Sequence, residues 1–351
     1  MGYTVSMVLQ TLFERSTALA AFSGAAVFGE PMSAHTAFKI GGPADLYIRP
    51  DAGCFVPYTA ALLGLARGAG VPVFILGGGT NLLVADSGIR GVVLDTGSWS
   101  GAFVAPVPAD ADTGRSVAEA RFRSGTLTDE AVSWAAAGGL SGLEDFAGLP
   151  GTVGGAVWMN ARCYESSVSD ALVSVTFLDE RLETVTVPAD PADYAYKKSP
   201  FQGRDTVILE AAMLLHTGDA ARSDHAAHGD HAARDYAARI AEKTAARRAE
   251  REEKGHFRYP SAGSVFKNNR DFGMPSGKIV EELGLRGLRS GGAQIAPWHG
   301  NFIVNTSGAT ANDVQRLIAL VQERAMRTFG FALEPEVISI GGAWSQHRKR
   351  C

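Results

Sequence analysis

The sequence has few cysteines, no long apolar run and no strong excess of charge of either sign. Only three cysteines occur among 351 residues, and they are too scattered for a disulfide framework or a CxxC metal site. No stretch of about 18 apolar residues is present, so we expect no membrane span. The net charge of −4 argues against a broad nucleic-acid surface. Glu14 and Arg15 interrupt the apolar residues of the N-terminal region, which favours a cytoplasmic protein over a secreted one.

What is present is typical of a globular protein with a core of full size. Hydrophobic residues make up 46% of the chain and charged residues 20%. The length predicts two or three domains, and a core of that size needs neither disulfides nor metals. Glycine is frequent, with 41 residues, and its clustering is more informative than its number.

The first glycine cluster lies between the apolar stretches 71–76 and 82–84. Glycines at such a turn let the backbone approach a ligand closely and direct its N–H groups outward, which suits a phosphate. A Walker loop is excluded because no lysine follows, and a dinucleotide fingerprint is excluded because Leu82 occupies the third glycine position. The alternative is a tight turn without a ligand. The candidate binding residues are Gly77, Gly78, Gly79, Thr80, Asn81 and Leu82.

A second glycine cluster over 148–155 is again set among apolar residues and contains no acid. Two such loops suit a long ligand with phosphates in its middle, such as FAD, although two independent turns remain the alternative. The candidate residues here are Pro150, Gly151, Thr152, Gly154 and Gly155.

The segment Tyr259–Asn269 brings a hydroxyl, an ammonium and a carboxamide within five positions, at Ser264, Lys267 and Asn268. A flexible Ala-Gly pair precedes the serine. Alone the segment indicates a polar loop, in which Ser264 would be a turn or capping residue. Together with the glycine loops it indicates an enzyme.

From about residue 36 to 342 the chain resembles the UDP-N-acetylenolpyruvoylglucosamine reductase (MurB) family of flavoenzymes. Each matching piece is weak alone, but their order and spacing make the combination specific. Besides the segments above, the resemblance rests on Phe38–Asp45, Leu76–Val84, Gly142–Glu144, Ala156–Ala161, Gly291–Gln294, Asn301–Asn305 and Leu333–Val337.

The resemblance implies an α+β fold, with a two-subdomain FAD-binding module of the PCMH type, as in vanillyl-alcohol-oxidase-like flavoproteins, and a C-terminal α+β substrate domain. The extra tyrosine-bearing loop of type I members has no counterpart, so a type II member is expected. The expected bounds are a leader helix and loop over 1–34, cofactor subdomains over 35–98 and 99–217, a linker over 218–235 and the substrate domain over 236–345. Residues 100–117 and 218–234 are expected to be insertions, and helices are expected over 128–137, 236–254 and 310–330.

The resemblance also implies the reaction. NADPH reduces FAD, and hydride then passes to the enolpyruvyl group of UDP-N-acetylglucosamine enolpyruvate, giving UDP-N-acetylmuramate for peptidoglycan synthesis. Ser264 is implied as the proton donor and Glu336 as an acid that stays protonated. The chain departs from the family at Lys197, where arginine is usual; we expect the lysine to neutralise the substrate carboxylate with a looser orientation, because it lacks the planar fork of a guanidinium.

For the diphosphate and sugar, the implied residues are Tyr164, Arg251, Lys267 and Asn268, together with Lys197. Arg251 lies in a charge run, and a solvated helix face is the alternative for it. Arg162 is a second departure from the family, and it either compensates for the lost arginine or lies on the surface. No partner beyond the sugar nucleotide and NADPH is expected, and the protein is expected to be a monomer.

Four histidines, His216, His225, His228 and His231, invite a metal site, but their alanine-rich surroundings favour a solvated linker, so no metal is expected. Two other functions stay open. One is a different flavin oxidoreductase with the same cofactor fold, such as an alcohol oxidase. The other is a non-catalytic flavin- or UDP-sugar-binding homologue, which the loss of the arginine makes conceivable.

Overall fold

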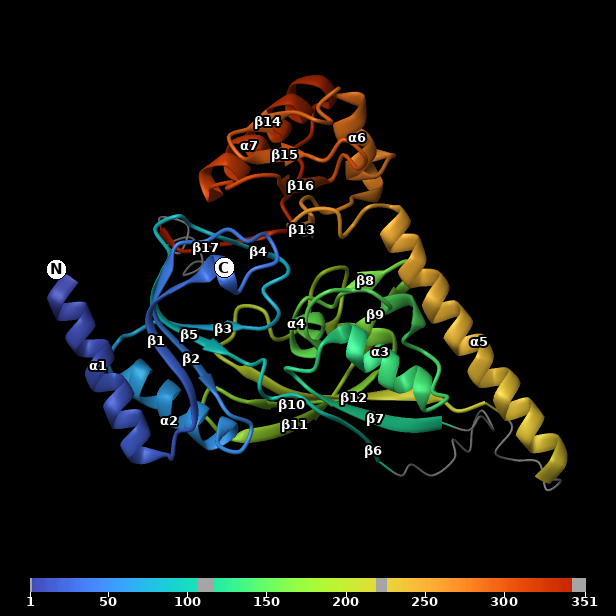
Figure 1. Ribbon diagram of the computed structural model, residues 1–351, viewed down its shortest axis with the longest axis horizontal. Coiled ribbons are helices and arrows are strands. Elements are labelled where there is room, and N and C mark those ends of the chain that lie inside the picture. Colours follow the sequence, from blue (N-terminus) through green and yellow to red (C-terminus); the bar gives the residue numbers. More distant parts are fainter. Residues whose placement is uncertain (1, 106–116, 219–225, 343–351) are drawn as a thin grey trace.

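The computed structural model describes residues 2–105, 117–218 and 226–342. Two α+β parts form the lower half of the molecule in Figure 1, and a third part lies above them. The long helix α5 runs along the second part and leads up to the third. The predicted α+β class agrees with this arrangement.

The first part contains a sheet in the order β1-β2-β5-β3, with β1 antiparallel to β2 and the other pairs parallel. Its central strand β5 is almost entirely buried, because its side chains pack with α1 and α2 on one face and with β4 and β17 (Ile338–Ile340) on the other. The elements are α1 (Gly2–Leu19), β1 (Gly24–Pro31), η1 (Met32–Ala34), β2 (Pro43–Pro50), α2 (Phe55–Gly68), β3 (Val73–Leu76), β4 (Leu82–Val84) and β5 (Ile89–Asp95).

The expectation of a separate leader over 1–34 is wrong in its second half. Residues 24–31 are not a loop but strand β1, which pairs with β2 along its whole length. Leu9 and Leu12 of α1 are buried in the same core as α2. The periodicity of β1 is weak because most of its side chains are exposed at the sheet edge, so its sequence gave little sign of a strand.

The second part is an antiparallel sheet in the order β11-β10-β12-β7-β6. Strand β7 alternates buried and partly buried side chains, as a sheet with one face on a core requires. The elements are β6 (Ala102–Ala105), β7 (Val117–Arg123), α3 (Thr128–Ala137), η2 (Glu144–Phe146), α4 (Val153–Trp158), β8 (Arg162–Cys163), β9 (Ser166–Ser167), η3 (Val168–Asp170), β10 (Leu172–Leu178), β11 (Thr184–Pro188), η4 (Pro191–Asp193) and β12 (Val207–His216). Helix α3 has the predicted bounds, whereas β6 occupies the start of the predicted insertion over 100–117, and 106–116 lie outside the described residues.

Helix α5 (Ala226–Glu253) begins well inside the stretch expected as a linker over 218–235. The reason is its alanine content, because alanine has the highest helix propensity and outweighs the interspersed histidine and glycine. The helix packs on α3 and η2 of the second part. It therefore belongs as much to the wall of the second part as to the third.

The third part is a small sheet in the order β13-β16-β15-β14, covered by α7. Helix α7 has the predicted ends: Thr310 and Asp313 cap its start reciprocally, and Gly330, at φ 80°, ends it. The elements are β13 (Ser261–Ser264), η6 (Arg270–Phe272), α6 (Ser276–Glu282), β14 (Arg289–Ser290), β15 (Ala293–Ile295), β16 (Phe302–Asn305), α7 (Ala311–Phe329) and β17 (Ile338–Ile340).

The last strand, β17, leaves the third part and pairs in parallel with β4 of the first. Figure 1 shows the two strands side by side between the first and third parts. The third part and the first are therefore joined by a sheet as well as by side-chain packing, in which Phe38 and Leu83 of the first part enter the core of the third.

Candidate functional site

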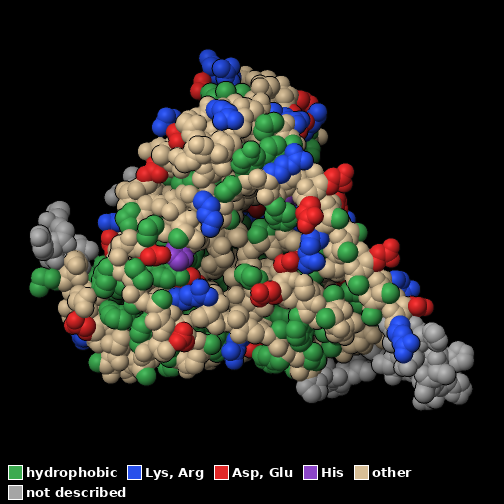
Figure 2. Space-filling view, viewed as in Figure 1, with side chains coloured by type: hydrophobic (Ala, Val, Ile, Leu, Met, Phe, Trp, Pro, Cys, Tyr) green, Lys and Arg blue, Asp and Glu red, His purple; other side chains and the backbone are tan. Residues whose placement is uncertain are grey.

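A single large cleft lies where the three parts meet. Its volume is about 2100 Å³, and its lining residues come from all three parts. Figure 2 shows a hollow in the middle of this face, with lysine and arginine side chains at its margin. Every residue predicted to hold the cofactor, and every predicted catalytic residue, lines this cleft.

The two glycine loops, far apart in sequence, lie against each other at the base of the cleft. A Cβ added at Gly78 would lie 2.7 Å from the Cα of Gly151, and one at Gly77 would lie 2.7 Å from Oγ1 of Thr152. Gly79 has φ +62°, and a Cβ there would lie 2.0 Å from the carbonyl oxygen of His35. Close approach of backbones therefore requires glycine at 78 and 79, and at Gly77 a side chain would meet the Thr152 hydroxyl.

The backbone N–H groups of these loops are free to bind an anion. Within the described ranges, no hydrogen bond is donated by the N–H groups of residues 77–81 or of Gly151 and Thr152. Buried or half-buried N–H groups without partners are costly unless a ligand or water accepts from them. Such a set of donors beside glycines fits the pyrophosphate of a dinucleotide such as FAD.

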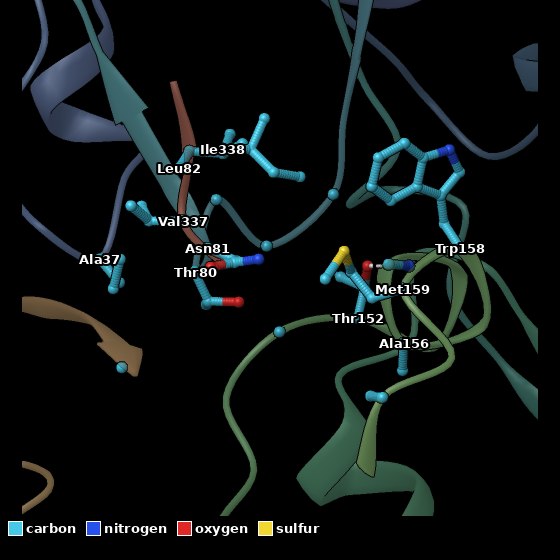
Figure 3. A pocket seen from close by; sticks show the side chains of 18 of the residues that line it. Ala37, Thr80, Asn81, Leu82, Thr152, Ala156, Trp158, Met159, Val337 and Ile338 are labelled. Carbon is cyan, nitrogen blue, oxygen red and sulfur yellow. Dashed lines mark hydrogen bonds between the residues drawn. The ribbon is translucent and has the colours of Figure 1, made fainter. Parts of the chain in front are cut away.

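Figure 3 shows the two sides of the cleft facing each other. Thr80, Asn81, Leu82, Val337 and Ile338 lie on one side. The residues opposite come from the second loop and from α4, and they are Thr152, Ala156, Trp158 and Met159. Trp158 and Met159 were not predicted as site residues, although their place directly after the second glycine loop was a signal that could have found them.

Lys197 and Glu336, two of the predicted catalytic residues, form an ion pair in the cleft. The Lys197 Nζ lies 2.6 Å from Oε1 of Glu336, and only 13% and 11% of the two side chains are exposed. Lys197 lies in a tight turn with φ 58°, a left-handed conformation that a lysine adopts only where its surroundings enforce it. The turn is held by reciprocal backbone hydrogen bonds between Ala195 and Lys198, and Gln202 donates to the Lys197 carbonyl.

Ser264 ends strand β13 and lines the same cleft. Within the described part of the chain its hydroxyl has no hydrogen-bond partner, so it is available to a ligand. The next residue, Val265, accepts a hydrogen bond of 2.7 Å from the backbone N–H of Glu336. The structure thus brings together all three predicted catalytic residues from three separate segments.

The neighbouring acid Glu334 has a different partner. Lys267 lies 2.5 Å from Oε1 of Glu334, whose side chain is 70% exposed. Asn268 lines the cleft, but its carbonyl oxygen Oδ1 accepts from the N–H of Ser276. Both predicted substrate residues therefore lie at the cleft. Lys267 is paired with Glu334, and Asn268 holds the start of α6 through its carbonyl oxygen.

Tyr164 and Arg251 meet at the C-terminal end of α5. The Tyr164 hydroxyl donates to Glu250 over 2.8 Å, and the guanidinium of Arg247 lies 3.7 Å from the ring centroid. Burial, followed by the hydrogen bond to Glu250, raises the pKa of Tyr164. Arg251 is buried and donates to the carbonyl of Ala147, so the alternative of a solvated helix face is wrong for it.

Arg162 lies on β8, lines the cleft and pairs with Glu165 over 3.0 Å. Its role as a substitute for the missing arginine stays a hypothesis. Its neighbour Cys163 is buried, and burial raises the pKa of its thiol, which favours packing over reactivity.

Two histidines of the third part line the cleft and were missed. His256 and His299 are 6.1 Å apart between ring centroids, and both pack on Phe302. Burial lowers the pKa of His256 to about 4 and lowers that of His299, so both rings are neutral near pH 7. Of the histidines considered for a metal, His225 lies outside the described residues, and no cluster of metal-ligating side chains is found among the described ones.

Cations outnumber acids among the residues that line the cleft, although the whole chain carries −4. The acids among its lining residues are Asp205 and Glu336, and the cations are Arg67, Arg90, Arg162, Lys197, Arg204, Arg251, Lys254, Arg258 and Lys267. A cleft of one sign attracts ligands of the other, so the expected ligands are polyanions such as dinucleotides and sugar nucleotides.

Two known protein families match the parts of the chain that form the cleft. Residues 255–340 match the C-terminal domain of UDP-N-acetylenolpyruvoylglucosamine reductase, and residues 59–187 match the FAD binding domain family. In the part of the chain that the structure describes, no helix is both long and apolar enough to cross a membrane.

Individual relatives cover nearly the whole chain. UDP-N-acetylenolpyruvoylglucosamine reductase from Treponema denticola is 40% identical over 330 residues, which cover 91% of this chain and 94% of that protein. The enzyme of the same name from Treponema pallidum is 35% identical and covers 89% of this chain. The crystal structure of the reductase from Thermus caldophilus superimposes with a TM-score of 0.68 at 28% identity, covering 91% of this chain and all of that one.

Proposed function

The chain belongs to the UDP-N-acetylenolpyruvoylglucosamine reductase family, and on this premise we propose which of its residues carry out the NADPH- and FAD-dependent reduction of UDP-N-acetylglucosamine enolpyruvate to UDP-N-acetylmuramate. One observation carries the proposal. A single cleft rich in lysine and arginine joins the free N–H groups of the two glycine loops to Ser264, Lys197 and Glu336.

The residues that would hold FAD are those of the touching glycine loops. Their N–H groups would receive the pyrophosphate, and glycine at 77–79 and at Gly151 lets the backbones come close enough. When bound, FAD takes hydride from NADPH and passes it on to the substrate. The remaining chemistry falls to the side chains of this chain.

Ser264 would supply the proton. Addition of hydride to one carbon of the enolpyruvyl double bond leaves an enolate conjugated to the substrate carboxylate, and the other carbon then takes a proton from the serine hydroxyl. An unpaired hydroxyl at the end of a strand that faces the cleft suits this transfer.

Lys197 and Glu336 would act on the developing negative charge. Lys197 neutralises the carboxylate through one or two hydrogen bonds, in place of the arginine fork. Glu336, next to it at 2.6 Å, polarises the enolate when it carries a proton.

The diphosphate and sugar would lie towards α5 and α6. Lys267 and Asn268 bind from the third part, and Arg251 and Tyr164 form the opposite edge. Glu334, the exposed partner of Lys267, would be displaced by the diphosphate as the stronger anion.

We further propose the division of the chain into cofactor subdomains over 35–98 and 99–217 and a substrate domain over 236–345, with α1 and β1 added to the first subdomain. The protein would act as a type II enzyme in the cytoplasm, as a monomer.

A simple experiment tests the function. The purified protein should show a flavin spectrum and oxidise NADPH only when UDP-N-acetylglucosamine enolpyruvate is present. Absence of flavin would overturn the proposal, and it would also exclude every other flavin-dependent oxidoreductase. Oxygen consumption independent of the substrate would favour an oxidase, and flavin without turnover would favour a binding homologue.

A further inference from the structure

Asn81 ends the first glycine loop and directly precedes β4, and it holds the chain on both sides of Val337. Its side-chain Nδ2 donates to the carbonyl of Glu336 over 3.2 Å. Its own carbonyl accepts from the N–H of Ile338 over 3.0 Å. The loop that faces the cofactor is therefore bonded directly to the segment that carries the catalytic glutamate.

The other side of Glu336 is held by the strand of Ser264. The backbone N–H of Glu336 donates to the carbonyl of Val265 over 2.7 Å. The Glu336 peptide groups are thus bonded to the cofactor loop at the carbonyl and to the Ser264 strand at the N–H. These two bonds fix the direction in which the Cα–Cβ bond of Glu336 leaves the backbone.

The adjacent residue of the same loop has a different task. The hydroxyl of Thr80 donates to the carbonyl of Pro150 over 3.4 Å, so it ties the two glycine loops to each other. In Figure 3 Thr80 and Asn81 lie next to each other at the edge of the cleft, close to Val337. The two neighbouring side chains can therefore be compared directly: Thr80 contacts the second glycine loop, and Asn81 contacts the backbone of Glu336.

The carboxylate of Glu336 is held less firmly than its backbone. Its partner Lys197 presents a single charge on a flexible stem, which fixes a carboxylate less firmly than an arginine fork would. In this chain the placement of the acid consequently depends on the bonds to its backbone.

We propose that Asn81 is a positioning residue for Glu336, and that it couples the cofactor loop to the acid used in the second half of the reaction. The proposal rests on the proposed function. Hydride transfer from NADPH to the flavin requires neither the proton of Ser264 nor the polarising acid Glu336, whereas reduction of the enolpyruvyl group uses both residues, Ser264 for the single proton and Glu336 to stabilise the enolate. Loss of the Asn81 amide should therefore slow one half-reaction and spare the other.

The test uses the flavin-loaded protein and two substitutions that keep the number of side-chain heavy atoms, Asn81→Leu and Thr80→Val, followed by stopped-flow flavin absorbance. In Asn81→Leu, reoxidation by the enolpyruvyl sugar nucleotide should slow by about 10- to 100-fold more than reduction by NADPH does, as expected for a misplaced catalytic group. In Thr80→Val both half-reactions should change by the same factor. Asn81→Asp, which keeps the shape but replaces the donor by an acceptor, should repeat the asymmetry if the leucine protein retains no flavin.

A second readout does not depend on turnover. Hydrogen exchange of residues 334–340 should be faster in Asn81→Leu than in the wild type and in Thr80→Val. Equal slowing of the two half-reactions, or unchanged exchange in this segment, would overturn the positioning role. If the wild-type flavin is not reoxidised by the sugar nucleotide, the proposed function fails, and the exchange measurement still decides whether Asn81 holds the segment.

Discussion

Two regions of the cleft are built in different ways. We call the two glycine loops the wall, and the group formed by Lys197, Ser264 and Glu336 the junction. The wall is two short glycine-rich stretches that act through backbone N–H groups. The junction combines single side chains, Lys197, Ser264 and Glu336, from three distant segments. The wall can be recognised within a window of six residues, whereas the junction exists only once the chain has folded.

The sharpest test of the junction removes its acids. Ser264→Ala and Glu336→Gln should each lower kcat by about 10²- to 10⁴-fold, the range for loss of a general acid, with flavin retained. Steady-state kinetics and the flavin spectrum check this. Glu334→Gln, a matched change two residues away on an exposed side chain, should alter the KM for the sugar nucleotide and leave kcat nearly unchanged. Equal kcat in Glu334→Gln and Glu336→Gln would remove Glu336 from the mechanism.

The corresponding test of the wall adds one methyl group. In Gly78→Ala the new Cβ would lie 2.7 Å from the Cα of Gly151, so the loops must separate and most of the flavin should be lost. Gly68→Ala, at the end of α2 with nothing within 4 Å, should retain it. The ratio of flavin to protein absorbance after gel filtration measures both. Full flavin content in Gly78→Ala would mean that the contact between the loops is dispensable.

Two substitutions of Lys197 separate the effect of its positive charge from the effect of its hydrogen-bond geometry. Lys197→Ala should lower kcat/KM by about 10- to 100-fold, because it also leaves the poorly exposed Glu336 without its partner. Lys197→Arg should restore or tighten substrate binding, because the fork binds a carboxylate through two hydrogen bonds. Kinetics at varied substrate concentration separate the two effects. A normal Lys197→Ala protein beside an unchanged Lys197→Arg protein would show that Lys197 takes no part.

The smallest expected effect is the pH dependence of stability that His256 of the third part contributes. Burial lowers the pKa of His256 to about 4, below the value of about 6.5 in an unfolded chain. The unfolded state then binds more protons between these values, so the contribution of His256 to stability is complete above about pH 6.5 and is lost as the pH falls towards 4. The Tm should fall by roughly a few degrees from pH 7 to pH 5, and by less in His256→Phe, which keeps the ring against Phe302. The same pH slope in both proteins would contradict this.

The comparison of wall and junction also explains what the sequence could predict. The glycine loops and both ends of α7 were predictable because each depends on residues a few positions apart, such as Thr310 with Asp313. The meeting of Lys197 with Glu336 was implied only by resemblance to a family, since no local pattern relates them. The pairing of β1 and the lining histidines His256 and His299 were missed because tertiary packing decides them. The early start of α5 was missed although its alanine content favours a helix, because the histidine and glycine in the same stretch indicated a linker.

Strand β17 has a consequence for how the protein is made. Asn81 and Glu336 are 255 residues apart, so the first part emerges from the ribosome long before the strand that pairs with its β4. Contacts of such separation form late in folding. A nascent chain can fold its cofactor wall early, but it acquires its catalytic acid only when synthesis has passed residue 340. Unfinished chains would therefore lack the acid needed for the second half-reaction.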